Sequence, residues 1–185
     1  MNRKPNRGAR PAHRTRPPGA TSTVWCRHAC PLGTLKIVAD ASGVTAITFD
    51  GQKHDVTPAP GWHEDARDPR LAETVRQLDR YFAGRASTFD LPLAARGTPF
   101  QHAVWRAIAE VPPGATITYA ELARRAGRPA AVRAAAAATA RNPWTIVVPC
   151  HRIVGTDGSL TGYAGGLGRK RALLAHEGVG AGSGR

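Results

Sequence analysis

Two neighbouring stretches in the first third of the chain, residues 35–39 and 44–49, are mostly apolar and contain several β-branched residues. Short apolar runs of this kind, bounded by turn residues, are typical of β-strands. The residues between the two stretches are Asp, Ala, Ser and Gly, which favour a turn. The pattern therefore predicts a β-hairpin. A further strand is expected at residues 89–93, after a proline-containing loop over residues 51–68.

A helical period replaces this β pattern after residue 70. The apolar residues Leu71, Val75, Leu78 and Phe82 recur three or four positions apart, and a glycine two residues later favours the end of a helix. The hairpin and this helix together predict a small α/β domain over residues 22–93, and the next few residues are a plausible linker.

The second half of the chain predicts a domain of short helices over residues 97–178. Residues 98–101 carry the threonine, proline and glutamine of a capping box, so a helix is expected from there to about Glu110. A second capping signal at Thr118 begins a short helix, and an alanine-rich helix follows from about residue 129. This succession has the outline of a helix-turn-helix.

The last third contains an apolar run, a glycine-rich stretch and a final helix. The run over residues 146–154 predicts a buried strand. Residues 161–167 contain too much glycine for a regular element, and they are interpreted as a loop whose backbone approaches a ligand. A helix is expected over residues 169–177.

Charge and composition narrow the class of protein. The formal net charge is +13, which predicts attraction to a polyanion, and nucleic acid is the leading candidate. Residues 1–21 are basic and nearly devoid of apolar side chains, so they are expected to form a disordered tail that is either a solvated extension or a DNA tether. Residues 179–185 are expected to fray. Three cysteines and no long apolar segment favour a cytoplasmic protein without a membrane partner.

The most informative cysteine lies in the sequence Val148-Pro149-Cys150-His151-Arg152. A single cysteine in an apolar run is usually an inert core residue. Here an imidazole and a guanidinium follow it directly, and neighbouring cations lower the pKa of a thiol toward the nucleophilic thiolate. The residues therefore favour a nucleophile over an inert thiol.

Four motifs together resemble the O6-alkylguanine-DNA alkyltransferases, also called methylated-DNA–protein-cysteine methyltransferases. They are residues 97–101 (GTPFQ), 141–143 (RNP), 148–152 (VPCHR) and 160–166 (LTGYAGG), and the likeness covers about residues 30–178. The resemblance implies an α/β N-terminal ribonuclease-H-like domain plus a mostly α C-terminal domain with a winged helix-turn-helix.

The resemblance also implies the chemistry, which is DNA repair by direct damage reversal. The alkyl group of O6-alkylguanine, and also of O4-alkylthymine, would pass once to Cys150 after the base is flipped out of the duplex. His151 would take the thiol proton through a water, Glu177 would orient the imidazole, and Asn142 would brace the reactive turn. No cofactor is implied, and residues 26–30 lack the spread of ligands that a zinc site uses.

The residues expected at the DNA follow from the same resemblance. Arg133 would enter the duplex and fill the space of the flipped base, and Tyr119 would press on the adjacent phosphate. Ala134 and Ala136 lie on the helix expected to approach DNA, and Arg152 is a further expected contact. Two alternatives stay open, because a lone helical arginine is often a solvated charge and an alanine run also suits a tightly packed helix.

The resemblance likewise implies a guanine pocket. Tyr163 would hydrogen-bond the extruded guanine, the amide of Ala164 would face its O6 atom, and the carbonyl of Ile153 would accept from its exocyclic amine. Thr139 and Trp144 are expected to line the mouth of the pocket.

The expected partner is double-stranded DNA carrying O6-alkylguanine, bound by a monomer in the nucleoid, with cooperative assembly on DNA left open. One alternative is a non-catalytic helix-turn-helix module that binds damaged bases, as in alkyltransferase-like proteins, where the reactive cysteine is replaced. Another alternative is a cysteine hydrolase. His151 argues against it, because it directly follows Cys150, whereas hydrolases bring a histidine from elsewhere in the sequence.

Overall fold

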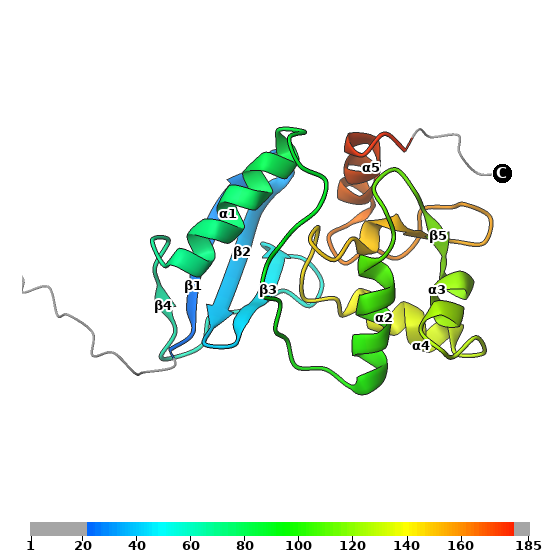
Figure 1. Cartoon of the computed structure of the whole chain (residues 1–185), viewed down its shortest axis with the longest axis horizontal. Coiled ribbons are helices and arrows are strands. Elements are labelled where there is room, and N and C mark those ends of the chain that lie inside the picture. Colours follow the sequence, from blue (N-terminus) through cyan, green and yellow to red (C-terminus); the bar gives the residue numbers. More distant parts are fainter. Residues whose placement is uncertain (1–21, 180–185) are drawn as a thin grey trace, which may run out of the picture.

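The structure, a computed structural model, describes residues 22–179. The tails predicted over residues 1–21 and beyond residue 179 lie outside the described residues. A sheet with a helix on one face forms the first part of the chain, here called the sheet domain, and short helices form the second part, the helical domain (Figure 1).

The sheet domain has four strands in the order β3-β2-β1-β4. Ile37 lies opposite Ile47 across an antiparallel pair, which confirms the predicted hairpin. The fourth strand, only two residues long, lies in the predicted loop and pairs with β1 in parallel. The strands are β1 (Val24–Cys30), β2 (Gly33–Asp40), β3 (Gly43–Phe49) and β4 (His63–Glu64).

Helix α1 (Pro69–Phe82) covers one face of this sheet, as the spacing of its apolar residues predicts. It buries Leu71, Leu78 and Tyr81 against the inward side chains of the strands. Burying a leucine side chain contributes on the order of 2 kcal/mol, so packing holds the helix on the sheet. A separate cluster around Trp25 covers the opposite face.

The helical domain contains α2, α3, α4 and α5. The capping box at the start of α2 is confirmed, because Thr98 Oγ1 accepts from the amide of Gln101 and the Gln101 side chain accepts from the amide of Thr98. Thr118 caps α3 through one bond, from the amide of Glu121 to its hydroxyl. The alanine-rich helix begins a few residues later than predicted. The helices are α2 (Pro99–Ala109), α3 (Tyr119–Arg125), α4 (Val132–Ala140) and α5 (Leu167–His176).

The strand predicted over residues 146–154 is wrong for most of its length. Only β6 (Ile153–Val154) is extended and paired, in parallel with β5 (Ile117–Thr118), and a 3-10 turn, η1 (Cys150–Arg152), precedes it. Pro149 has no amide hydrogen to donate to a ladder, and Ile146 has a positive φ of 74°, so the chain cannot stay extended. The run is apolar because it is buried.

The strand predicted at residues 89–93 is also wrong, because its only pairing is a single bridge between Leu93 and Val44. Pro92 cannot donate to a ladder. The side chain of Gln77 bonds both the amide and the carbonyl of Asp90, at 2.8 and 2.7 Å, and so replaces a neighbouring strand.

The outer edge of β3 joins the two domains (Figure 1). The amide of Ile47 donates to the carbonyl of Pro143, and the amide of Thr145 donates to the carbonyl of Ile47, both at 2.8 Å. The indole of Trp144 donates to the carbonyl of Val44, also at 2.8 Å. The segment that leads to Cys150 is therefore held as a short extension of the sheet.

The β2–β3 turn provides a test of this packing. Gly43 has a φ of 135°, and a Cβ atom there would lie 2.0 Å from the carbonyl oxygen of Pro92. Gly43→Ala should lower the free energy of unfolding by about 3 kcal/mol, because it adds a backbone clash to the strain of a positive φ. Urea unfolding measures this loss.

The matched control is Gly51→Ala, where φ is also positive, at 75°, but no atom lies within 4 Å of the new Cβ. This variant should lose only about 1 kcal/mol. Equal losses in the two variants would contradict the close approach of residues 43 and 92.

Candidate active site

Cys150 opens the η1 turn and is 5% exposed. The side-chain amide of Asn142 donates to its Sγ atom at 3.1 Å and to the carbonyl of Val148 at 2.8 Å, while its oxygen accepts from the amide of Trp144. One asparagine thus ties three points of the turn together. The structure brings Asn142 to the thiol, where a hydrogen-bond donor favours the thiolate.

The charges around the thiol differ from those that the sequence suggests. Burial raises the pKa of the Cys150 thiol, and the Asn142 hydrogen bond and the charge of Lys170 oppose this effect. Lys170 is fully buried, and its Nζ atom donates to the carbonyls of Ile153 and Thr161 at 2.5 and 2.7 Å. Burial lowers the pKa of Lys170 to about 8.

Sequence reasoning missed Lys170, although a signal is present. Lys170 precedes Leu173 and Leu174 by three and four positions, so a helical period places it on their buried face. A lysine on an apolar helix face is nearly always held by specific partners. Here the partners are two carbonyl groups beside the thiol.

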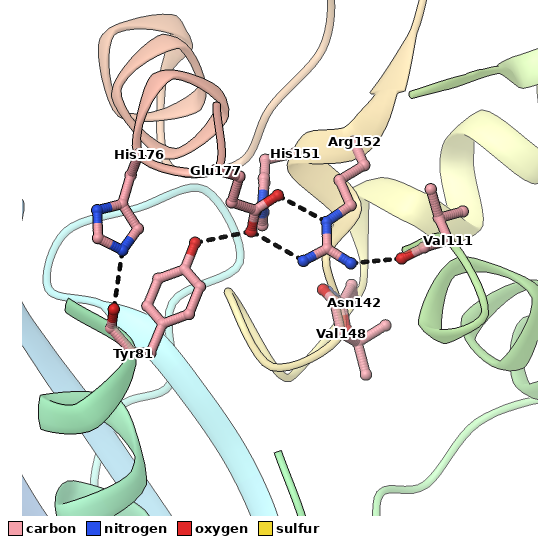
Figure 2. A network of polar contacts seen from close by, with 8 residues as sticks. All are labelled: Tyr81, Val111, Asn142, Val148, His151, Arg152, His176 and Glu177. Atoms are coloured by element: carbon pink, nitrogen blue, oxygen red, sulfur yellow. Dashed lines mark hydrogen bonds and ion pairs between the residues drawn. The ribbon is translucent and has the colours of Figure 1, made fainter. Parts of the chain in front are cut away.

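His151 is fully buried behind the thiol, and its Nε2 atom lies 2.9 Å from Glu177 Oε1 (Figure 2). Because a carboxylate only accepts, the proton sits on Nε2 and Nδ1 carries the lone pair. Nδ1 is buried, and no described side chain or backbone group bonds it. Burial lowers the pKa of His151 and the neighbouring Glu177 opposes this effect, so the ring is a neutral base at rest.

Glu177 is the most heavily bonded side chain of the network in Figure 2. It accepts from His151, from the guanidinium of Arg152 through two nitrogens at 2.8 Å each, and from the hydroxyl of Tyr81 at 2.8 Å. Burial raises its pKa, but the bonds from His151 and Arg152 outweigh that and hold the pKa at about 2.

The expected DNA contact of Arg152 is wrong. Its side chain is buried, and its guanidinium is used by Glu177 and by the carbonyl of Val111 (Figure 2). No local pattern predicts this pairing, because Arg152 and Glu177 lie 25 positions apart. Arg152 therefore fixes the carboxylate rather than a phosphate.

A loop over residues 160–166 lies beside this cluster. The hydroxyl of Tyr163 is buried and has no partner among the described residues. The hydroxyl of Tyr119, at the start of α3, donates to the carbonyl of Gly162 at 3.1 Å, and the carbonyl of Ala164 accepts from the amide of Lys53 at 3.1 Å. Both domains therefore hold the loop.

Arg169 is a second residue that the sequence analysis missed. Its guanidinium donates to the carbonyl of Leu32 in the sheet domain at 2.8 Å and to the carbonyl of Gly165 at 3.0 Å, and it lies over the ring of Phe49. It therefore clamps the loop to the sheet domain.

Two residues expected at the mouth of the pocket lie elsewhere. Thr139 is 2% exposed, and its hydroxyl donates to the carbonyl of Ala135 in its own helix. Trp144 is 5% exposed and packs edge-on against Trp105 between the domains. Both contribute to the core, so the expectation that they line an open mouth is wrong. Ile153 is fully buried, and its carbonyl already accepts from Lys170.

Helix α4 exposes one side and buries the other. Arg133 and Ala134 are exposed, Ala136 is half-buried, and Ala135 and Ala138 are buried. Arg133 makes no hydrogen bond or ion pair with any part of the chain that the structure describes. The inner side of the alanine run therefore packs tightly, which is one of the two alternatives, and small side chains lie on its outer side.

Within residues 22–179, no three His, Cys, Asp or Glu side chains gather to hold a metal ion. No described helix has the length and apolar character needed to cross a membrane.

The cluster has the parts of a group-transfer site with a cysteine nucleophile. The thiol has a donor and a cation beside it, and the neighbouring imidazole has a free nitrogen and a carboxylate behind it. It also lies next to a helical pair with an exposed basic side chain. These features define a cysteine-dependent transferase joined to a helical surface.

Comparison with known proteins gives the family. Residues 24–95 match the ribonuclease-like domain and residues 99–179 match the DNA-binding domain of 6-O-methylguanine DNA methyltransferase. The chain is 44% identical over 148 residues to the methylated-DNA–protein-cysteine methyltransferase of Methanosarcina acetivorans, covering 80% of this chain and 94% of that protein. The chain belongs to the methylated-DNA–protein-cysteine methyltransferase family.

Further relatives agree. The enzyme of the same name from Haemophilus influenzae is 40% identical, with 85% of this chain and 87% of that protein covered. The crystal structure of Mycobacterium tuberculosis OGT in complex with DNA has a TM-score of 0.76 and 40% identity, and the match covers 83% of this chain and 92% of that chain.

The role of Lys170 can be tested through thiol reactivity. Lys170→Met should raise the pKa of Cys150, because it removes the nearby positive charge that opposes burial. At neutral pH iodoacetamide should modify Cys150 about tenfold more slowly in the variant than in the wild-type protein. The difference between the two rates should shrink as the pH rises, because Cys150 then ionises in both proteins. Mass spectrometry of the Cys150 peptide measures the rate separately from those of Cys26 and Cys30.

Arg171→Met is the matched control, because it removes a positive charge from the next, exposed position of the same helix. The rate at which iodoacetamide modifies Cys150 should stay within about twofold of the wild-type rate. A Lys170→Met protein that reacts as fast as this control would show that the lysine charge does not act on the thiol.

Proposed function

We propose that the protein repairs DNA by direct reversal, moving the alkyl group from the O6 atom of guanine to Cys150 once per molecule. The observation that carries the proposal is the buried Cys150 thiol, which has Asn142 and Lys170 beside it and the pair of His151 and Glu177 behind it. The names of the relatives describe the same acceptor, a protein cysteine. O4-alkylthymine is the proposed second substrate, because it carries the same O-alkyl group beside a ring nitrogen.

The thiol proton leaves first. Glu177 holds the proton of His151 on Nε2, so the unpartnered Nδ1 accepts the Cys150 proton through a water. The thiolate then attacks the alkyl carbon, and the S–C bond forms as the C–O6 bond breaks. The guanine anion that leaves takes up the proton held by His151, so the products are S-alkylcysteine and guanine.

The developing guanine anion needs hydrogen-bond donors aimed at it. We propose the hydroxyl of Tyr163 and the amide of Ala164 for this role. The unsatisfied, buried hydroxyl supports the assignment, since a buried polar group without a partner is costly unless a ligand bonds it. The Ile153 carbonyl has one lone pair on Lys170 and the other for the exocyclic amine of guanine.

Helices α3 and α4 are proposed as the two helices of a winged helix-turn-helix, with the exposed face of α4 in a groove of double-stranded DNA. Arg133 would enter the stack in place of the flipped base, and Tyr119 would approach the neighbouring phosphate. The exposed side chain of Arg133, which no described group binds, supports this role. Ala134 and Ala136 are small enough to allow a close approach of the backbone.

The remaining proposals concern architecture and setting. We propose domains over residues 22–93 and 97–178, the first of ribonuclease-H-like fold, which agrees with the family match over residues 24–95. We also propose that the protein acts as a monomer on chromosomal DNA in the cytoplasm. The structure of a relative in complex with DNA supports DNA as the partner.

The transfer itself is the first test. Incubation with duplex DNA containing O6-methylguanine should add one methyl group to the Cys150 peptide, as seen by mass spectrometry, and the yield should stop at one equivalent of protein. Cys150→Ser should bind the same DNA and gain no methyl group. An unmodified Cys150 after prolonged incubation with excess damaged DNA would overturn the proposal.

The flipping role of Arg133 is tested by comparing two substrates. Flipping costs a few kcal/mol in a duplex and nothing for a free base. Arg133→Ala should therefore slow transfer from duplex DNA by at least about tenfold and leave the reaction with free O6-benzylguanine nearly unchanged. Arg106→Ala, which removes one exposed charge from α2, controls for the loss of charge alone. Equal losses on both substrates would refute the role.

A further inference from the structure

Tyr81 belongs to the sheet domain, yet its hydroxyl reaches the carboxylate at the centre of the site. It is the second-last residue of α1, is 2% exposed, and donates to Glu177 Oε1 at 2.8 Å (Figure 2). The two residues are 96 positions apart. The roles proposed above do not use this contact.

The Tyr81 hydroxyl binds the same oxygen of Glu177 that contacts His151, the proposed base. Oε1 is the atom that faces His151 Nε2 at 2.9 Å, and it also accepts from Arg152 Nη2 at 2.8 Å. An anion shared among more donors offers less negative charge to each of them. The Tyr81 hydroxyl therefore influences both the place of Oε1 and its attraction for a proton on His151.

Tyr81 is held in place independently of Glu177. Its carbonyl accepts from His176 Nε2 at 2.8 Å, and its ring packs against the ring of His176, with centroids 4.9 Å apart. The rings of Phe82 and Phe89 contact it as well, at 5.3 and 5.5 Å. A donor that neighbouring groups fix in advance loses little conformational freedom when it binds the carboxylate.

We propose that Tyr81 is a positioning residue through which the sheet domain acts on the reaction, holding Glu177 Oε1 in line with His151 and drawing off part of its charge. The imidazole then stays neutral at the pH where it must take the Cys150 proton. The inference rests on the proposed transfer to Cys150 and adds to it a role for a residue outside the helical domain.

The direction of the effect follows from the groups that face the pair. His151 is faced by Lys170 from α5, by Glu177 directly after that helix and by Arg152 from η1, and the hydroxyl of Tyr81 reaches Glu177 from α1. The Tyr81 bond lowers the pKa of Glu177, and the Glu177 charge raises the pKa of His151. Without the hydroxyl, the carboxylate charge acts more strongly, so the pKa of His151 rises.

The experiment is the pH dependence of transfer from free O6-benzylguanine to the full chain with Tyr81→Phe, which keeps the ring and removes only the hydroxyl. The acidic limb of the plot of rate against pH should move to higher pH by roughly half to one unit. At pH values below the shifted limb, the variant should react about three- to tenfold more slowly than the wild-type protein, and at alkaline pH the two rates should agree. Thermal unfolding of each variant is measured alongside.

Thr74→Val is the matched control. It also removes one buried hydroxyl from α1 and keeps the shape of the side chain, but the Thr74 hydroxyl donates to the carbonyl of Arg70 within the helix and leaves the Tyr81 bond to Glu177 intact. It should keep the acidic limb of the wild-type protein, even if its unfolding temperature falls. A shift as large as that of Tyr81→Phe would mean that the packing of α1, and not the Tyr81 hydroxyl, sets the profile.

The other outcomes also decide the matter. An unchanged profile in Tyr81→Phe, or an equal loss at every pH, would overturn the role of Tyr81 while transfer by the unmodified protein upholds the proposed function. Failure of the unmodified protein to react would instead overturn the function itself. If Tyr81→Phe is too unstable for kinetics, NMR titration of the His151 ring at low temperature tests the same upward shift of its pKa.

Discussion

One buried carboxylate fixes the arrangement of the site. Glu177 has a side chain that is 2% exposed, and an anion taken out of water at such a place needs hydrogen bonds on both oxygens. It receives them from Tyr81 on α1, and from His151 and Arg152 on η1. Arg152 in turn bonds the carbonyl of Val111 just after α2. Removing one partner of such a buried pair typically costs 3–5 kcal/mol, so these four segments are locked to one another.

The sheet domain is part of the site rather than a separate module beside it. The edge of β3 pairs with the chain around Trp144, the amide of Lys53 bonds Ala164, and Arg169 ties the loop at Gly165 to Leu32. Each of these contacts involves a backbone group on at least one side, and the β3 and Lys53 contacts are backbone to backbone. Backbone contacts fix the path of a segment without demanding a particular side chain there, which explains how a glycine-rich loop with few side-chain contacts keeps a defined shape.

The features that the sequence predicted are those with local signals. The hairpin turn and the capping box at Thr98 are set by residues within a few positions of each other, and both are as expected. The errors arose where tertiary contacts decide. Residues 146–154 are apolar because they are buried, not because they are extended, and Arg152 and Trp144 find partners 25 and 100 positions away. The motif around Cys150 was readable because its chemistry is contiguous, whereas the roles of Lys170 and Tyr81 depend on helices that meet only in the fold.

The electrostatics around Cys150 suit a thiol that can be used only once. Burial raises the thiol pKa, so the resting group is a protonated thiol, which is less open to oxidation and to other electrophiles than a free thiolate is. The groups that favour ionisation of the thiol lie around it. Lys170 and Asn142 favour the thiolate, and the unpartnered nitrogen of His151 can accept the proton. A permanently ionised thiolate would be consumed by whatever reagent reached it first. A thiol that ionises only when the alkylated guanine is bound instead keeps the single reaction of each molecule for the lesion.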